Sequence, residues 1–130
     1  MLFAALMLAQ TAPVCAAMDA ALPPPLAGWT MTHTGLSLGH GGTLDVSNGA
    51  AQADFHVDAA GTYGIALDQP GWIDVSAKGA SAALKSVKHG HGPDCSTIKK
   101  IVRFALKPGD YRLDLKNLKQ AQAKVMLTRE

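Results

Sequence analysis

The fold is decided by the stretch Ala51-Gln-Ala-Asp-Phe-His-Val57, in which small or apolar residues alternate with polar ones. In a β-strand the odd-numbered residues would lie on one face, and the polar Gln52, Asp54 and His56 would lie on the other. An amphipathic helix would instead need apolar residues every three to four positions, and the stretch does not have them. The period of two therefore predicts a strand with one face in a core and the other in solvent.

Alternation of the same kind recurs along the chain. It is found in residues 63–67, 73–75, 102–106, 111–115 and 125–127. Turn-forming residues separate these segments, namely Asn48-Gly49, Gln69-Pro70-Gly71 and Lys107-Pro108-Gly109-Asp110. Short strands with regular turns predict an all-β fold, an antiparallel two-sheet sandwich of the jelly-roll or immunoglobulin-like class with about eight strands. The one helical turn that we expect is short and lies at Ser96–Lys100.

The first residues have the composition of an export signal. Leu2–Ala9 is an uncharged apolar run that is too short to cross a bilayer as a helix. Small residues at the last and third-last positions favour cleavage after Ala16 or Ala17, so residues 1–17 are expected to be a signal peptide. We therefore expect the mature protein to be periplasmic or secreted.

The remaining chain is expected to contain a linker and one domain. Residues 18–27 include Pro23-Pro24-Pro25 and predict a stiff, extended linker, and residues 28–130 predict the β-sandwich domain. The formal net charge is only +2, and the basic residues are scattered. Lys99 and Lys100 in particular are interpreted as solvated strand residues. The sequence therefore predicts no nucleic-acid partner and no integral membrane segment in the mature chain.

The densest group of chemically reactive side chains is the stretch His89-Gly-His-Gly-Pro-Asp-Cys95. His89 and His91 are two residues apart, so a strand would present both rings on one side, and Gly90 would let a loop do the same. Imidazole nitrogens and a cysteine thiolate are typical ligands of zinc and copper. His89, His91 and Cys95 are therefore the candidate metal ligands.

Other residues are candidates for completing such a site or for binding a small ligand. Asp94 lies within the same stretch, and His40 would supply a further ligand if its loop lay at the same end of the sandwich. Trp72 alternates with Ile73 and Val75, so its indole is expected to face away from the core, where it would be able to stack on a sugar or polymer. Trp72 and Asp94 are therefore the candidate ligand-binding residues.

Three other interpretations of this stretch remain open. The glycines and the proline are typical of a connection between strands, with the histidines exposed. Cys95 would act as a nucleophile if its thiolate were stabilised, but the sequence shows no group that would orient a base. In an oxidising compartment Cys95 would instead form a disulfide, for which Cys15 is the sole partner. That disulfide is favoured if the signal is cut ahead of Cys15, and it would withdraw the Cys95 thiol from metal chemistry.

The chain also resembles a family of small exported bacterial β-sandwich proteins, over roughly residues 26–127. The resemblance is carried by Ala60–Leu67, Trp72–Val75, the HGHGPDCS run at His89–Ser96, and Leu106–Tyr111. It implies the same fold and export, with no activity established for the family. Some members of this family carry the label homogentisate 1,2-dioxygenase.

The dioxygenase label does not suit this sequence. Such an enzyme holds Fe(II) with two histidines and a carboxylate, usually a glutamate, inside a cupin domain of a much larger chain. The only glutamate here is Glu130, at the end of the chain. The favoured interpretation is an exported binding or accessory module that binds a transition metal or a small ligand at the HGHGPDC stretch. The alternatives are a metal-dependent enzyme that uses the same residues and a purely structural envelope protein.

Overall fold

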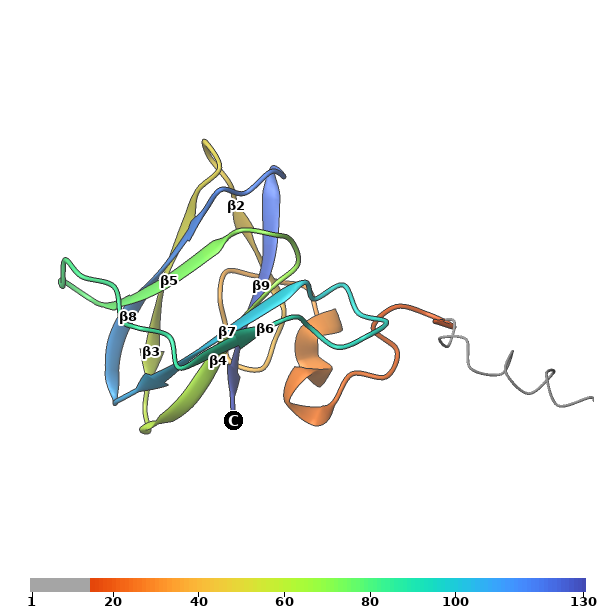
Figure 1. Ribbon diagram of the computed structural model, residues 1–130, viewed down its shortest axis with the longest axis horizontal. Helices are drawn as coiled ribbons and strands as arrows, with labels where there is room; N and C mark the ends of the chain where they lie inside the picture. Colours follow the sequence, from red (N-terminus) through yellow and green to blue (C-terminus); the bar gives the residue numbers. More distant parts are fainter. Residues whose placement is uncertain (1–14) are drawn as a thin grey trace, which may run out of the picture.

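The computed structural model describes residues 15–130, so the predicted signal peptide, residues 1–17, lies almost entirely outside the described residues. Within this part of the chain nine strands form two sheets (Figure 1). The strands are β1 (His33–Thr34), β2 (Gly42–Asp45), β3 (Ala51–Val57), β4 (Gly61–Leu67), β5 (Trp72–Ala77), β6 (Lys88–Gly90), β7 (Lys100–Leu106), β8 (Gly109–Lys116) and β9 (Gln122–Arg129).

The sheets differ in width. Six strands form one sheet in the order β1-β2-β9-β4-β7-β6, and three strands form the other in the order β3-β8-β5. Every strand pair is antiparallel except β1 with β2. The all-β, two-sheet sandwich that the alternation predicts is therefore confirmed.

The core between the two sheets consists of the inward-facing positions of the alternating strands. They include Tyr63, Ile65 and Leu67 of β4, Val102, Phe104 and Leu106 of β7, and Tyr111, Leu113 and Leu115 of β8. Both tyrosines satisfy their hydroxyl groups locally, as buried tyrosines must. Tyr63 donates to the carbonyl oxygen of Ala59 at 2.7 Å, and Tyr111 donates to that of Lys107 at 2.7 Å.

The expected Asn-Gly turn joins β2 to β3 in the way its sequence predicts. Asn48 and Gly49 both adopt positive φ angles, 54° and 75°. Ser47 and Ala50 exchange both backbone hydrogen bonds across the turn, at 2.9 and 3.0 Å. Two successive positive φ angles are what a type I′ hairpin requires, and asparagine and glycine reach them most readily.

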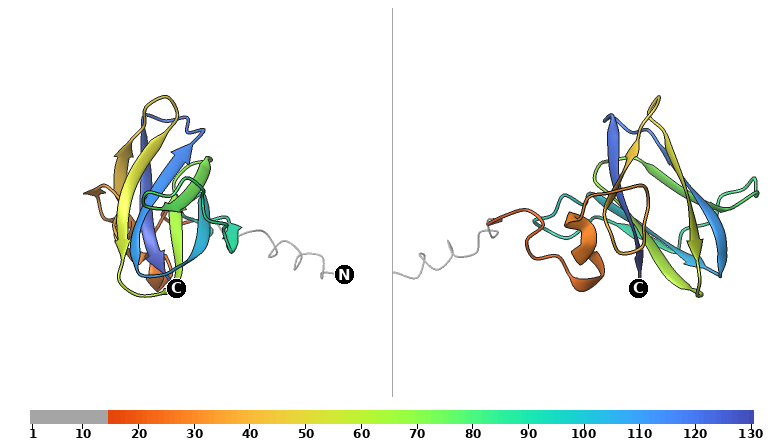
Figure 2. Two further views of the ribbon diagram at one scale, coloured as in Figure 1. Left: turned by 90° about the vertical axis from the view of Figure 1, so that its left-hand side faces the viewer. Right: turned by 180° about the vertical axis from the view of Figure 1, so that it is seen from behind.

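The six-stranded sheet is also covered on its outer face. There Ala66, Ile101 and Met126 are buried beneath a 3-10 helix, η2 (Pro24–Thr30), which follows the N-terminal segment. Figures 1 and 2 show this segment in orange on the side of the large sheet away from the small one. Trp29 is fully buried in this second cluster.

Two expectations differ from this arrangement. Residues 18–27 were expected to form a linker, but Leu26 is 7% exposed and packs in the second core cluster, because the apolar outer face has to be shielded from water. The helical turn expected at Ser96–Lys100 is absent from the structure, since Lys100 already begins β7. Within residues 15–130 no helix has the length and hydrophobicity that a membrane crossing needs.

The two tryptophans provide a test of this second core. Trp29 is 0% exposed and donates from Nε1 to the Thr97 hydroxyl at 2.8 Å, whereas Trp72 is 57% exposed. We expect Trp29→Ala to lower the free energy of unfolding by about 3–5 kcal/mol, because it leaves a large cavity. Trp72→Ala should lower it by under about 1 kcal/mol. Urea denaturation of both variants measures the difference, and equal losses would contradict the assignment of Trp29 to a core.

Candidate ligand-binding trough

The difference in sheet width leaves part of the large sheet's inner face uncovered. His89 of β6 pairs directly with Val102 of β7, so both side chains lie on the same face as the core. The small sheet ends at β5, and Trp72 and Ile73 of β5 line the same hollow as His89 and Val102. An open seam therefore runs between β5 on one side and β6 and β7 on the other.

The start of β5 is held in place by a buried amide. Gln69 is 2% exposed, and its Nε2 donates to the carbonyl oxygen of Gln122 at 3.0 Å and to Asp68 Oδ1 at 3.1 Å. Its Oε1 accepts weaker bonds from two backbone N–H groups in the β8–β9 connection, each at 3.4 Å. Because these bonds satisfy both ends of the amide, they fix the connection from β4 to β5.

Gly71 and Lys100 then position Trp72. A Cβ atom on Gly71 would lie 2.6 Å from Leu118 Cδ2 and 3.2 Å from the Lys116 carbonyl oxygen, so a larger residue would require Leu118 to shift. The Lys100 ammonium donates to the Gly71 carbonyl oxygen at 2.7 Å and lies 5.6 Å from the centre of the Trp72 ring. That distance is within the range of a cation–π contact. The lysine therefore connects the first residue of β7 to the first residue of β5.

We call the hollow along this seam the trough. Its upper part, beside Trp72, has a volume of about 170 Å³, and its lower part, beside His91, has a volume of about 510 Å³. The two parts share His89 and Lys100. The lining residues are Pro70, Gly71, Trp72, Ile73, Ser86, His89, Gly90, His91, Lys99, Lys100 and Val102. Among the described residues, those that line the trough supply two lysines and two histidines but no acidic side chain.

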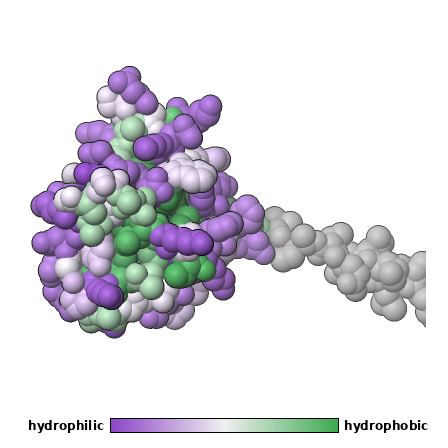
Figure 3. Space-filling view, turned by 60° about the vertical axis from the view of Figure 1, so that its left-hand side comes forward, coloured by the Kyte–Doolittle hydropathy of each residue, from purple (hydrophilic) through white to green (hydrophobic). Residues whose placement is uncertain are grey.

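The molecule also exposes apolar surface. Figure 3 shows one side of it, where hydrophobic residues gather in the middle of the face and hydrophilic residues surround them. Trp72 and Val87 are 57% and 58% exposed. Val87 hydrogen-bonds through its N–H to the Arg103 carbonyl oxygen at 2.8 Å, so it lies beside β7, next to the trough-lining Ser86.

The structure brings together some of the predicted site residues and separates others. His89, His91 and Trp72 all line the trough, as does Lys100, which was interpreted as a solvated strand residue. Asp94 is exposed and lines neither part. The predicted set of three metal ligands is not assembled, and no group of three His, Cys, Asp or Glu side chains in residues 15–130 is placed to hold a metal ion.

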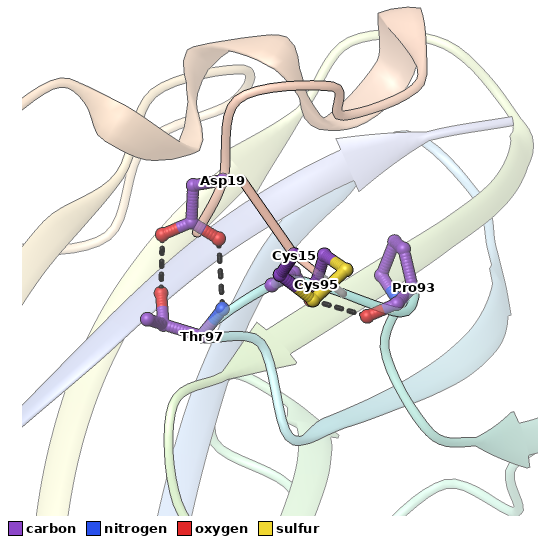
Figure 4. Close-up of a disulfide and its surroundings, with 6 residues drawn as sticks. Cys15, Asp19, Pro93, Cys95 and Thr97 are labelled. Atoms are coloured by element: carbon purple, nitrogen blue, oxygen red, sulfur yellow. Dashed lines mark hydrogen bonds between the residues drawn. A yellow bond between two sulfur atoms is a disulfide. The ribbon is translucent and has the colours of Figure 1, made fainter. Parts of the chain in front are cut away.

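Cys95 is instead bonded to Cys15 (Figure 4). The two Cα atoms are 5.4 Å apart, which is an ordinary separation for a disulfide. Asp19 reinforces the link, since its carboxylate accepts hydrogen bonds from the Thr97 N–H at 2.7 Å and the Thr97 hydroxyl at 2.6 Å. The sulfur of Cys95 is therefore occupied, and the N-terminal segment is tied to the loop that follows β6.

This disulfide bears on the expected signal cleavage. A cut after Ala16 or Ala17 would release Cys15 with the signal, so that cut and the Cys15–Cys95 disulfide cannot both occur in one mature chain. In the structure, the residues after Ala17 also contribute to the fold, because the Asp19 N–H donates to the Cys95 carbonyl oxygen at 2.8 Å. A chain that carries this disulfide therefore retains Cys15.

His40 lies far from the trough. It stacks on His33 with ring centres 4.9 Å apart, and His33 belongs to β1. β1 and β6 are the opposite edges of the six-stranded sheet. Five strand spacings separate them, roughly 24 Å, so His40 does not complete a site with His89.

His56 lies between two aspartates on another part of the sandwich. The exposed ring of His56 is held by Asp110, with Nδ1 2.7 Å from Oδ1, and by Asp58, with Nε2 3.0 Å from Oδ1. The hydrogen bond and charge of Asp110, assisted by Asp58, raise the pKa of His56 above its ordinary value. This cluster joins the β3–β4 turn to β8 and is not part of the trough.

The sequence does indicate that Lys100 faces inward, although the scattered charges favoured a solvated position. Lys100 is two residues before Val102 and four before Phe104, and both of these face the core. The period of two therefore places Lys100 on the inner face, where a charged side chain needs a partner. In contrast, nothing in the sequence indicates that Ser86 approaches the same site, since it depends on how the connection from β5 to β6 crosses between the sheets.

Comparison with known proteins places the chain in no family: no protein-family model matches it, and no curated protein matches it.

We expect the protein to retain Cys15 in an intramolecular disulfide. The two cysteines are 80 residues apart, and closing a loop of this length stabilises a protein by about 2–5 kcal/mol. Cys15→Ser and Cys95→Ser should therefore lower the free energy of unfolding equally, and the double variant should lower it no further. Intact mass without reductant identifies the N-terminus, and a chain that begins at Ala17 or Met18 would contradict the expectation.

The His56 cluster predicts a pH dependence. Since the folded pKa of His56 is raised, its stabilising contribution is complete below the unfolded pKa, near 6.5, and is lost as pH rises through the folded pKa. In an NMR titration, the midpoint of His56 should lie above this ordinary value. Asp110→Asn should lower the midpoint more than Asp58→Asn does, and a midpoint that responds to neither variant would rule out the cluster.

Proposed function

We propose that this protein is an exported binding module that holds a saccharide or other small ligand in the trough between β5 and β6–β7. The observation that carries the proposal is the placement of Trp72. A large aromatic side chain is 57% exposed at the start of a strand whose backbone is fixed on both sides. Half-exposed indole rings are typical of sites that stack on the apolar face of a ring.

The polar groups around Trp72 support a binding role. Lys100 and His89 line both parts of the trough, and His91 and Lys99 extend it along the large sheet. Ammonium and imidazole groups donate hydrogen bonds to hydroxyl or carboxylate oxygens, so they would orient a ligand whose ring lies on Trp72. The strands that carry His89 and Lys100 need little rearrangement on binding.

A transition-metal site is less well supported than a ligand site. Cys95, the third predicted ligand, is bonded to Cys15. Only His89 and His91 of the predicted ligands remain, and both line the lower part of the trough. Zinc sites in proteins use at least three protein ligands as a rule. Zinc or copper would therefore bind to the oxidised protein more weakly than to an assembled three-ligand site.

A catalytic role is supported even less well than a metal site. A nucleophilic role would need the Cys95 thiolate, and its sulfur is bonded to Cys15. The described residues that line the trough include no carboxylate that would orient its histidines. Binding without turnover is therefore the function that the geometry supports best, and the purely structural alternative leaves the exposure of Trp72 unexplained.

Tryptophan fluorescence tests this proposal directly. Trp29 is fully buried, so a ligand-dependent change in emission reports on Trp72. We expect a panel of neutral and charged oligosaccharides to contain at least one that changes the emission saturably and that also gives heat in calorimetry. Trp72→Ala should abolish both signals.

Controls separate binding from unfolding. The thermal midpoint of Trp72→Ala should remain close to that of the unmodified protein, because the side chain is largely exposed. Lys107→Gln, at the far end of β7, should bind normally. If the whole panel leaves the emission of the folded protein unchanged and releases no heat, the proposal is wrong.

A further inference from the structure

The charges of the trough specify the ligand further, and this inference rests on the proposed function. We infer that the trough binds an acidic saccharide, whose units are sugar rings that carry a carboxylate, as in a uronate. Each such unit has an apolar ring face and a negative charge. These match the two features of the trough, an exposed indole and a row of cationic or hydrogen-donating side chains.

The row of donors is continuous. Lys99 and His91 line the lower part, Lys100 and His89 line both parts, and Trp72 lines the upper part. The described residues that line the trough offer no carboxylate to neutralise the lysines. A cationic lining without its own counter-ion favours an anionic ligand over a neutral one.

Lys100 shows that the charge is positioned rather than merely present. Its ammonium has one fixed partner, the Gly71 carbonyl oxygen at 2.7 Å, and lies 5.6 Å from the Trp72 ring centre. An ammonium group has three donors, so two remain for a ligand. In a hexuronate the carboxylate is bonded directly to the sugar ring. A carboxylate that binds Lys100 would therefore place its ring close to the Trp72 indole.

The shape of the trough favours an extended ligand. Its two parts join at His89 and Lys100, and both are open along the seam between the sheets rather than enclosed. An open groove of this kind suits successive units of a chain, with ring stacking at Trp72 and carboxylates along Lys99 and His91. The formal net charge of the whole protein is only +2, so the preference for an anion comes from this local cluster.

The deciding experiment compares an oligogalacturonate with its methyl ester, which has the same rings without the charge. We expect calorimetry and Trp72 fluorescence to give saturable binding of the acid at low salt, roughly tenfold tighter than that of the ester. Binding of the acid should weaken as salt is raised to about 0.5 M, because exposed ion pairs are screened.

Variants assign the effect to the trough. Lys100→Gln and, independently, Lys99→Gln should each weaken binding of the acid by roughly five- to tenfold and change binding of the ester little. Lys107→Gln serves as the matched control, since it removes an exposed lysine at the opposite end of β7. Lys99 is exposed, so its variant tests the inference even if the Lys100 variant is unstable.

The outcomes are distinguishable. Equal affinity for acid and ester that Trp72→Ala abolishes would overturn the acidic specificity and leave the binding function intact. Tighter binding of poly-glutamate or single-stranded DNA than of the oligogalacturonate would overturn the saccharide assignment. No binding of either form, together with a response of Trp72 to some other member of the saccharide panel, would overturn the inference alone.

Discussion

The central strands of the large sheet bury apolar side chains on both faces, and the rest of the structure depends on covering both. On the inner face the alternating residues of β4, β7 and β9 pack against the three-stranded sheet. On the outer face Ala66, Ile101 and Met126 would meet water if η2 and its tryptophan did not lie over them. A sheet with one apolar face needs one partner layer, whereas this sheet needs two.

The trough follows from a mismatch in the same layering. Three strands are too few to cover the inner face of six, and the deficit falls at β6 and the start of β7. At this edge the sequence places polar groups at inward-facing positions. Lys100 lies on the same face of β7 as Val102, and His89 of β6 pairs with Val102. A buried lysine without a partner would be strongly destabilising, but at this open edge its ammonium reaches both a carbonyl oxygen and solvent. The site is therefore a property of the edge of the core and requires no separate insertion.

The strands and turns were largely predictable because their signals are local. The alternation in Ala51–Val57 and its repeats identifies the main strands, and Asn48-Gly49 identifies a hairpin, since each depends only on neighbouring residues. The site was predictable in part. His89, His91 and Trp72 were identified by residue type, but their association with Lys100 arises from pairing between distant strands.

Two predictions from the sequence were wrong because they also depend on contacts between segments that are distant along the chain. Pro23-Pro24-Pro25 is typical of a linker, and only the presence of an apolar outer face explains why the following Leu26 is buried. Cys95 was grouped with the histidines because they are close in sequence, yet it is bonded to Cys15, and its carbonyl oxygen accepts a hydrogen bond from the Asp19 N–H. Cys95 therefore faces the N-terminal segment and lines neither part of the trough. Closeness in sequence does not show whether a loop converges on one site or divides between two.

That division has a mechanical consequence for the loop between β6 and β7. Its two ends are fixed by sheet pairing, His89 with Val102 on one side and the Lys99 N–H to the Leu67 carbonyl oxygen at 2.8 Å on the other. Only its middle, at Cys95 and Thr97, is tied to the N-terminal segment. Breaking the disulfide would thus loosen the outer cover first, while the ladders of β6 and β7 keep His89, Lys100 and Val102 in register. The stability of the outer cover and the geometry of the trough are therefore set by different interactions, although a single loop takes part in both.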